Sequence, residues 1–357
     1  PRGASTMTAT PGLGAATTAT AAGPDVLSEL LKVVRLSGSV FINALFTAPF
    51  GVVSPRYYDP AAPQSDRRQA SILHLIVEGD CTLEMADGTT RDVHAGDLLF
   101  LPLADVHRFR RGAPARDAQA AEIVSSGPVE GMFTVDYGGG GAPLRMVCGF
   151  VESAELLFAP VFRTLPSLMV ESTAGDAVGG PIASTIREIL GLVDAAAPGS
   201  QAILGRLMEL LFVETLRRHV ARLPAGERGW FGALNDPVVG RALQSIHADP
   251  SRPWTIEVLA REVGTSRTVL GERFRALLGR PPIDYVTAWR IQLAAERLRL
   301  GRESIAQVAI AAGYESETSF SRAFRRVTGQ SPGRWREQGG WSTPNGLPLR
   351  PMPAGAI

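Results

Sequence analysis

The sequence predicts an α+β protein with an N-terminal antiparallel β-barrel, helices that follow the barrel, and an all-α domain at the C-terminus. Between residues 40 and 136, short apolar runs alternate with polar residues in steps of two and are separated by turns. That pattern is typical of a small antiparallel barrel or sandwich. From residue 182 the apolar spacing becomes helical, and beyond residue 236 one helical unit occurs twice.

Composition indicates a protein with real cores and no membrane partner. The chain has 357 residues, 45% of them apolar, which allows two or three domains. Its two cysteines, Cys81 and Cys148, are too few for a disulfide framework and favour a reducing cytoplasm. No apolar run approaches the roughly 18 residues that a membrane span needs, and no secretory signal is recognisable. We therefore expect a cytoplasmic location.

Both ends of the chain are expected to be disordered. Residues 1–24 are a low-complexity run in which the six residues before Met7 resemble the remnant of a cleavable tag, and residues 337–357 are rich in Pro and Gly. Neither segment has the apolar content to pack a core.

Helices are expected on both sides of the barrel strands. An amphipathic helix is predicted from residue 25 to about residue 38, with its apolar stripe at Leu27, Leu30, Leu31 and Val34. After the strands, helices are predicted over residues 182–194 and 200–222. The apolar stripe of the second comprises Leu204, Leu207, Leu211, Phe212, Val213 and Leu216. This stripe fits either a domain core or a seam in a homodimer, and both alternatives remain open.

The repeated unit spans Leu259–Gly279 and Val308–Gly329. In each copy a small alanine precedes a turn glycine by four residues, and a serine follows that can cap the next helix. These residues are Ala260, Gly264 and Ser266 in the first copy and Ala309, Gly313 and Ser316 in the second. The helix after the serine is expected to bury three apolar side chains in each copy: Leu270, Phe274 and Leu277 in the first, and Phe320, Phe324 and Val327 in the second. A long helix over Pro281–Leu300 would hold the copies about one DNA turn, 34 Å, apart.

The opposite face of the capped helix carries small, hydroxyl and charged side chains in both copies. They are Arg267, Thr268, Gly271, Glu272 and Arg275 in the first copy, and Glu317, Thr318, Ser321, Arg322, Arg325 and Arg326 in the second. A helix that enters a major groove needs little bulk, donors and acceptors for base edges, and positive charge for phosphates. We predict that these faces bind DNA.

Charge is partitioned along the chain. Residues 236–336 contain 16 Arg and 10 acidic residues, a net charge of +6, although the whole chain carries only +1. A basic C-terminal part beside a mildly acidic remainder suggests that only the C-terminal part meets a polyanion. The alternative is a bundle of six or seven helices with incidental arginines. Two copies of the unit at matched spacing favour DNA binding.

This C-terminal pattern resembles the AraC/XylS family of bacterial transcription regulators. The resemblance covers about 100 residues, including "RIQLAAERL", "IAQVAIAAGYESETSFSRAFRRVTGQSP" and Pro332 to Arg336. It implies a tandem helix-turn-helix domain over residues 236–336 that binds promoter DNA and contacts RNA polymerase. Because most members of the family activate transcription, it also favours an activator over a repressor. The family's base-reading positions fall on Thr268, Gly271 and Glu272, and on Glu317, Thr318, Ser321 and Arg322. Many members have Arg at the position of Glu272, so we rely more on the second helix for guanine contacts.

The stretch "HLIVEGDCTLEMADGTTRDVHAGDLLFLPLADVHRF" is similar to the cupin barrel, and to the cupin-type sensor domain that precedes some AraC-type domains. Catalytic cupins bind a metal through H-x-H, a Glu and a later His. Here His74 and His107 match the first and last ligands, but Ile76 replaces the second. Alternation places His74 and Ile76, and His107 and Phe109, toward the interior.

Three interpretations of that interior remain open: a metal-free ligand pocket, a filled structural barrel, and a metal site. Zinc or another divalent metal could bind His74 and His107 together with Cys81 or Cys148, because borderline-soft ions accept imidazole and thiolate. Lone His and Cys residues on apolar strands are more often satisfied core residues. Candidate pocket residues are His74, Ile76, Cys81, His107, Phe109 and Cys148.

Together these observations predict a DNA-binding transcription regulator, not an enzyme, with a sensor domain over residues 25–173 and a helical dimerisation or linker region over residues 174–235. The sensor would bind a small-molecule effector. One alternative is a metal-binding cupin enzyme or metal sensor fused to a DNA-binding module. Another is that the barrel and the helix over residues 200–222 serve only for dimerisation, with regulation by the abundance of the protein.

Overall fold

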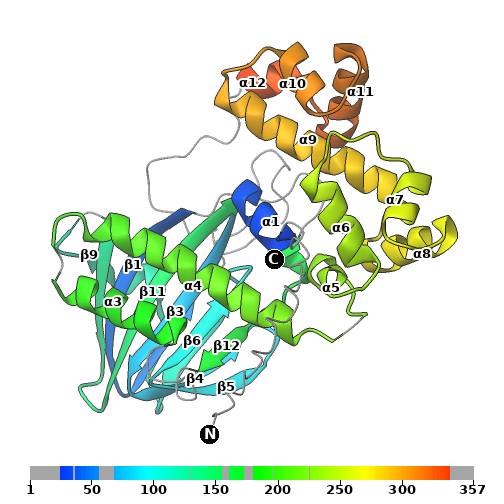
Figure 1. The fold of residues 1–357 in the computed structure, drawn as a ribbon. Coiled ribbons are helices and arrows are strands. Elements are labelled where there is room, and N and C mark those ends of the chain that lie inside the picture. The colour runs from blue at the N-terminus through cyan, green and yellow to red at the C-terminus, as the bar shows by residue number, and fades with distance from the viewer. Residues whose placement is uncertain are drawn as a thin grey trace, which may run out of the picture.

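The computed structural model describes residues 25–34, 37–55, 68–129, 131–154, 161–172, 180–195, 197–224 and 226–337. These residues form a sheet domain, made of two β-sheets and the helices that cover them, and a helical domain that follows (Figure 1). Of the two segments expected to be disordered, residues 1–24 and 338–357 lie outside the described residues, and Glu337 is the last residue of a helix that begins at Pro332. No helix within these ranges is both long and apolar enough to span a membrane.

The strands of the sheet domain form a large and a small sheet. The large sheet has the order β12-β6-β3-β11-β1-β10-β9, and the small sheet has the order β5-β4-β7-β2-β8. The strands of the large sheet are β1 (Ser37–Thr47), β3 (Arg68–Glu78), β6 (Asp97–Leu101), β9 (Val124–Ser126), β10 (Met132–Gly138), β11 (Pro143–Ala154) and β12 (Met169–Ser172). Those of the small sheet are β2 (Phe50–Ser54), β4 (Asp80–Met85), β5 (Thr90–His94), β7 (His107–Arg111) and β8 (Ala118–Gln119).

The sheet-rich N-terminal fold is confirmed, but its described strands form two facing sheets, not one closed barrel. Most neighbouring strands are antiparallel, as expected. However, β1 pairs with β10 in parallel, and β2 pairs with β8 in parallel. Alternation along a strand determines which face each side chain occupies, but it says nothing about the partner strand. The sequence pattern therefore could not predict the two parallel pairings.

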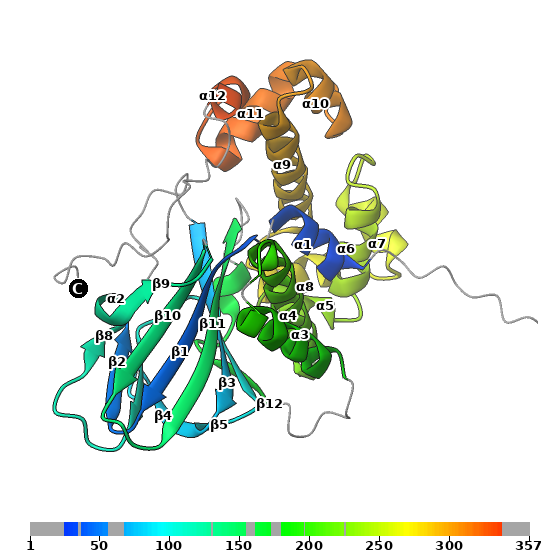
Figure 2. The same ribbon diagram turned by 90° about the vertical axis from the view of Figure 1, so that its left-hand side faces the viewer.

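The large sheet is the middle of three layers. On β3, Leu73 and Leu75 face one core, and His74 and Ile76 face the other, between the sheets. Helices α3 (Pro181–Ala195) and α4 (Ser200–Arg222) lie over the first face (Figure 2). The ring of Phe212 on α4 packs edge-on against Phe100, with 5.0 Å between ring centroids. Two short helices complete this domain, α2 (Ala120–Ile123) and the 3-10 helix η2 (Val161–Thr164).

The helices expected around the sheets are present. The first, α1 (Val26–Val34), is shorter than predicted because β1 starts at Ser37. The stripe on α4 forms part of the core through Leu204, Leu211, Phe212 and Leu216, all buried. The other side of α4 exposes Ile203 and Leu210, each 49% accessible.

The helical domain contains eight helices within the residues described here. They are α5 (Trp230–Leu234), α6 (Val239–Ala248), α7 (Ile256–Glu262), α8 (Arg267–Leu278), α9 (Pro282–Leu300), α10 (Ile305–Ala311), α11 (Glu317–Thr328) and α12 (Pro332–Glu337). We call α7 and α8 the first unit, and α10 and α11 the second unit. Since α8 directly precedes α9 and α10 follows it, the two units lie at either end of α9 (Figures 1 and 2).

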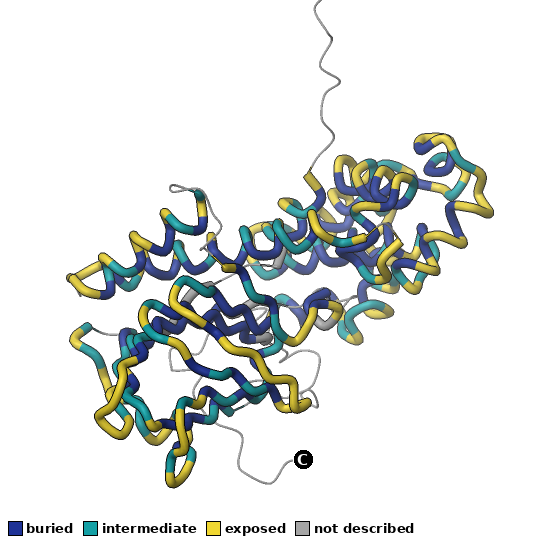
Figure 3. The backbone as a smooth tube through the Cα atoms, turned by 90° about the horizontal axis from the view of Figure 1, so that it is seen from below, coloured by how far each residue is buried: buried dark blue, intermediate teal, exposed yellow. Residues whose placement is uncertain are grey.

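The two domains share one apolar cluster. Helix α1 contacts α6 and α9, and η2 contacts α5. The cluster includes Leu30 of α1, Phe162 of η2 and Trp230 of α5. In Figure 3 the buried backbone continues from the sheet domain into the helical domain, and exposed backbone is concentrated on turns and outer helix faces.

Candidate DNA interface and polar interior

Local capping and turn geometry in both units is as the sequence predicts. The Ser266 side chain accepts a hydrogen bond from the Val269 amide, and the Ser316 side chain accepts one from the Ser319 amide, each at 3.2 Å. Gly264 and Gly313 have φ of +67° and +77°, a left-handed backbone that favours glycine. These features end the first helix of each unit and start the second in a defined direction.

The inner faces of α8 and α11 are buried as predicted. Leu270 and Phe274 on α8 and Phe320 and Phe324 on α11 have no exposed surface. Val327, expected in the second core, is partly buried against it. Fixing one face of each helix in a core leaves the opposite face available to a partner.

The candidate DNA-contacting residues lie mostly on those outer faces. Ser321 is half-buried, and the exposed residues are Arg267, Thr268, Glu272, Arg275, Glu317, Thr318, Arg322, Arg325 and Arg326. Gly271 differs from the expectation, because it is buried. A β-carbon built there would lie 3.9 Å from the Ile256 side chain of the preceding helix. Gly271 therefore sits at the side of α8 that faces α7, not on its outermost line.

Positive charge is freer on the second unit than on the first. Arg267 donates to Glu257 at 2.9 Å, so part of its charge is neutralised within the first unit. In the part of the chain that the structure describes, Arg322, Arg325 and Arg326 form no salt bridge. The guanidinium groups of α11 are thus available for phosphate oxygens or guanine edges.

A chain of hydrogen bonds crosses the interior between the two sheets. His74 Nδ1 lies 2.8 Å from Cys148 Sγ, and His74 Nε2 lies 3.0 Å from His107 Nε2. His107 Nδ1 lies 2.8 Å from the carbonyl oxygen of Asp105. Residues 74 and 148 are neighbours on β3 and β11 of the large sheet, and His107 comes from β7 of the small sheet. The chain therefore connects the two sheets through polar contacts.

The position of every proton in this chain follows from its last acceptor. A backbone carbonyl can only accept a hydrogen bond, so His107 Nδ1 carries a proton and donates a hydrogen bond to the carbonyl oxygen of Asp105. Neutral His107 then accepts at Nε2 from the Nε2–H of His74. Neutral His74 in turn accepts at Nδ1 from the thiol of Cys148. All three side chains are satisfied in their neutral forms.

Burial favours those neutral forms. It lowers the pKa of His107 to about 4, although its bond to Asp105 raises the pKa slightly. Burial, and then the nearby His107, hold the pKa of His74 well below its usual range. Burial also raises the pKa of the Cys148 thiol. Charging either ring would place an uncompensated ion in an apolar core.

The remaining candidate pocket residues take no part in this chain of hydrogen bonds. Cys81 pairs with Val93 at the far end of β4, whereas it is Met85 of β4 that pairs with His107. Burial raises the pKa of Cys81 to about 12, so its thiol stays protonated. Ile76 and Phe109 are core residues, and the Phe109 ring packs against His74 with 5.0 Å between centroids.

The geometry does not fit a single metal ion. Among the described residues, no group of three or more His, Cys, Asp or Glu side chains is placed to bind one. His74 directs its two nitrogens at different partners, so one ion could not be bound by Cys148, His74 and His107 together. A cavity of about 190 Å³ opens at the end of the small sheet beside His107, lined also by Val53, Glu84, Met85, Gly88 and Arg108.

His247 on α6 has a buried hydrogen-bond partner that comes from another helix. His247 Nε2 lies 2.9 Å from the Tyr285 hydroxyl, which also accepts a hydrogen bond from Trp230 Nε1 at 3.1 Å. The imidazole stacks on Trp289 at 4.0 Å between centroids. A signal was present, because Val239, Leu243 and His247 follow at steps of four on the buried face of α6. This polar cluster joins α5, α6 and α9.

Comparison with known proteins assigns both domains. Residues 25–221 match the Cupin family, and residues 259–338 match the Helix-turn-helix domain family. Since the first match covers more than half of the chain, the protein belongs to the cupin family. Its C-terminal helix-turn-helix domain makes it an AraC-type transcriptional regulator that binds DNA.

Three relatives illustrate the assignment. The HTH-type transcriptional regulator AlkR of Acinetobacter baylyi is 29% identical over 273 residues, covering 76% of this chain and 89% of that protein. A putative AraC-like transcription regulator of Streptomyces lividans is 40% identical over 161 residues, which is 44% of this chain and about half (53%) of that protein. An HTH-type transcriptional regulator of Haemophilus influenzae is 26% identical, covering 88% of this chain and 98% of that protein.

Proposed function

We propose that this regulator reads two adjacent major-groove segments of promoter DNA, one with α8 and one with α11. The observation that carries the proposal is the duplicated geometry. In each unit a capped helix packs one face into a core and presents an outer face of hydroxyl and charged side chains. Sequencing the genomic fragments that the purified chain retains tests this. Two short motifs about 10 base pairs apart are expected, and retention of random fragments would refute the proposal.

The two helices differ in what they can read. On α11, Arg322 can donate to O6 and N7 of guanine. The hydroxyl groups of Thr318 and Ser321 can form hydrogen bonds with base edges in the major groove or with phosphate oxygens. On α8, the carboxylate of Glu272 cannot bind guanine in that way, but it can accept from N4 of cytosine. We therefore propose that α11 supplies guanine and phosphate contacts, and that α8 reads its half-site with Thr268 and Glu272.

Replacing Arg322 by alanine is expected to weaken specific binding by roughly 1–3 kcal/mol and to relax base choice at one position. The exposed guanidinium has no salt bridge in the described chain, so its removal leaves no other group unpaired. Selection of binding sites with the variant measures both effects. Arg187→Ala, which removes an arginine that is also exposed, from α3 of the sheet domain, is the control and should retain the original motif. Identical motifs and affinities for Arg322→Ala and the parent chain would contradict the assignment.

We further propose that the sheet domain binds a small-molecule effector. The support is the cavity beside His107, which adjoins the polar chain between the sheets. An effector that binds only the folded domain raises its melting temperature. Compounds related to the products of the target genes are the first to screen in this way.

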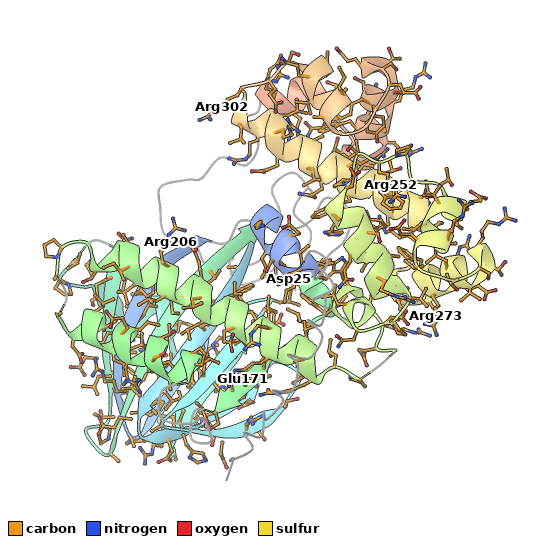
Figure 4. The ribbon with its side chains drawn as sticks, viewed as in Figure 1. Asp25, Glu171, Arg206, Arg252, Arg273 and Arg302 are labelled. Atoms are coloured by element: carbon orange, nitrogen blue, oxygen red, sulfur yellow. The ribbon has the colours of Figure 1, made fainter. Side chains whose placement is uncertain are left out.

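A homodimer is proposed from the outer face of α4. Ile203 and Leu210 are seven residues apart, so both lie on one exposed stripe, with Arg206 between them (Figure 4). Two such stripes could pack against each other about a twofold axis. Sedimentation of the chain at micromolar concentration is expected to give twice its 38.0 kDa mass, and Leu210→Asp should shift it toward the monomer. A monomeric parent chain would refute this.

The remaining expectations follow from the family and are proposed on that basis. We propose a regulator, not an enzyme, that acts in the cytoplasm, where promoter DNA is accessible. We also propose that it contacts RNA polymerase and activates transcription. A reporter gene behind a selected fragment should rise in expression with the regulator present, and a fall would indicate repression instead.

A further inference from the structure

The two units of the helical domain have separate cores. Tyr285 and Trp289 in the first half of α9 belong to the large apolar cluster that also contains the first unit. Ile291 and Leu298 in the second half belong to a smaller cluster with Phe320 and Phe324 of the second unit. Separate cores do not by themselves fix the orientation of one unit relative to the other. Apart from α9 itself, direct contacts between the units must do so.

Arg290, at the middle of α9, makes such contacts in both directions. Its Nε donates to the carbonyl of Pro250 at 2.6 Å, and its Nη2 donates to the carbonyls of Ser251 at 3.2 Å and Arg252 at 2.7 Å. These carbonyls belong to the loop between α6 and α7, which leads into the first unit. Its Nη1 donates to the carbonyl of Gly313 at 3.5 Å, in the turn of the second unit.

The loop that Arg290 binds is held in place by its own hydrogen bonds. The carboxylate of Asp249 accepts from the Ser251 hydroxyl at 2.8 Å and from the Arg252 amide at 3.1 Å. Trp254 Nε1 donates to the Asp249 carbonyl at 2.8 Å. Figure 4 shows Arg252 beside α9. The carbonyls that meet the guanidinium are therefore pre-arranged, and the contact is between two ordered elements.

Gly313 provides a second, independent contact at the same place. A β-carbon built on it would lie 2.7 Å from the Ser251 carbonyl oxygen and 2.9 Å from Ser251 Cα. The matching glycine of the first unit, Gly264, would meet nothing within 4 Å. Both have similar positive φ, so the turn alone explains glycine at both positions. Only Gly313 also allows its turn to touch the loop that leads into the first unit.

The space around this contact is not filled by apolar packing. A cavity of about 230 Å³ adjoins it, lined by residues that include Ser251, Arg290, Leu293, Arg297, Ala311 and Ala312. The polar contacts of Arg290 and the close approach at Gly313 connect the loop before α7 to the turn before α11 at the edge of this cavity.

We propose that Arg290, Gly313 and the loop Asp249–Trp254 form an inter-unit clamp that sets the spacing and angle between α8 and α11. The inference rests on the proposed reading of adjacent grooves by these two helices. A single helix such as α9 transmits spacing, but small bends and local rotations at its far end change the orientation of the second unit. The clamp restrains those motions close to the turn that precedes α11. Arg290 is a positioning residue, because it acts through the placement of the reading helices.

Arginine is the side chain suited to this position. Its planar guanidinium presents five donors in a fixed fork, so it can reach carbonyls of two loops at once. Lysine keeps the charge and most of the length but concentrates its donors at one point. The variant Arg290→Lys should therefore retain contact with one loop and lose the other.

The first experiment measures tolerance to half-site spacing. Binding is compared for a fragment with the selected spacing, for one with an extra base pair between half-sites, which rotates them by about 36°, and for a single half-site. The parent chain is expected to lose about 10-fold or more on insertion. In Arg290→Lys the loss should shrink to about threefold or less, because the second unit can reorient. Affinity for the single half-site should stay within about twofold of the parent, showing that each unit is folded.

The second experiment uses no DNA. Spin labels at Arg261→Cys and Ala306→Cys, both exposed and outside the reading faces, report the distance between α7 and α10. The natural Cys81 and Cys148 are buried and should stay unlabelled in the folded chain. A narrow distance distribution is expected for the parent and a clearly broader or shifted one for Arg290→Lys.

The two glycines give a matched control. Gly264→Ala and Gly313→Ala place the same strain in equivalent turns, but only the second creates a clash with Ser251. Gly313→Ala should alter the label distance and spacing tolerance, and Gly264→Ala should alter neither. Unchanged distances and spacing tolerance in both Arg290→Lys and Gly313→Ala would overturn the clamp. Loss of single half-site binding in Arg290→Lys would also overturn it, since Arg290 would then be needed for folding. If the parent chain selects no DNA, the proposed reading of grooves fails, and the label distances still decide whether the clamp exists.

Discussion

Replacing Phe324 by alanine is expected to destabilise the second unit by about 3–5 kcal/mol. The ring has no exposed surface, and it packs against Phe320 at 5.5 Å and Trp335 at 5.9 Å between centroids. Phe324 lies at the centre of a small core, because that cluster contains only ten buried residues in the described chain. Few neighbours are available to collapse into the cavity that the substitution leaves.

The loss should be local. The second core is separate from the cluster that joins the first unit to the sheet domain, so unfolding of residues 305–337 need not disturb the remainder. Hydrogen exchange is expected to accelerate in α10, α11 and α12 and to stay unchanged in the sheets and in α6–α8. Arg326→Ala, two residues along on the exposed side of α11, should leave exchange unaltered. Equal acceleration throughout the chain would show that the two cores unfold as one.

In the helical domain, the features that the sequence could predict depend on local patterns. Caps, turn glycines and the buried faces of α8 and α11 depend on residues within four positions of one another, and the repeat supplied each signal twice. Ser266 and Ser316 cap as expected, and Phe274 and Phe324 are buried as expected. Such features follow from helix geometry alone and need no knowledge of the tertiary contacts.

What the sequence could not predict depends on contacts between distant segments. Gly271 is buried because Ile256 of the preceding helix lies beside it, and helical spacing on α8 alone places it outward. In the sequence nothing distinguishes Arg290 from the other arginines. Its role depends on the carbonyls of Pro250 and Gly313, which only the folded chain places within hydrogen-bond distance. The same holds for Tyr285, which receives its partners His247 and Trp230 from two other helices.

The sheet domain shows the same division. Alternation correctly placed His74, Ile76, His107 and Phe109 in the interior. Alternation could not show which of the two cysteines lies beside His74. The pairing of β11 with β3 places Cys148 there, whereas Cys81 lies elsewhere, on β4. Strand pairing is set by loops and register over long separations, and neither is visible in a period of two. The polar chain is consequently a property of the assembled sheets.

Lowering the pH from 7 to 4 is expected to destabilise the sheet domain by about 3 kcal/mol through His107 alone. Its pKa is about 4 in the folded chain and near 6.5 when unfolded, so the unfolded state binds the proton first. The stability is fully present above pH 6.5 and is lost as the pH falls toward 4. His74, whose pKa is also lowered by burial, adds to the loss. Protonating His107 gives two facing Nε2–H donors and breaks the chain at its centre. Protonating His74 adds an Nδ1–H that faces the thiol of Cys148 and removes the acceptor for that thiol.

Urea denaturation at a series of pH values measures the effect, with reaction of Cys81 and Cys148 as the probe. Both thiols are buried between the sheets and belong to the sheet domain, so a disulfide reagent active in acid reports its opening. Tryptophan fluorescence reports the helical domain separately, because all five tryptophans lie beyond residue 229. There His247, with a pKa lowered to about 3 by burial, should produce its own loss of stability in acid.

The assignment to the buried pair depends on two variants. Replacing both rings, as in His74→Leu with His107→Met, removes the titrating groups without leaving one imidazole unpaired, so the dependence of thiol exposure on pH should flatten whatever the stability at pH 7. His94→Gln removes an exposed histidine and should leave the dependence unchanged. An equally steep dependence in the double variant would mean that carboxylates, not the interior histidines, govern the response of the sheet domain to acid.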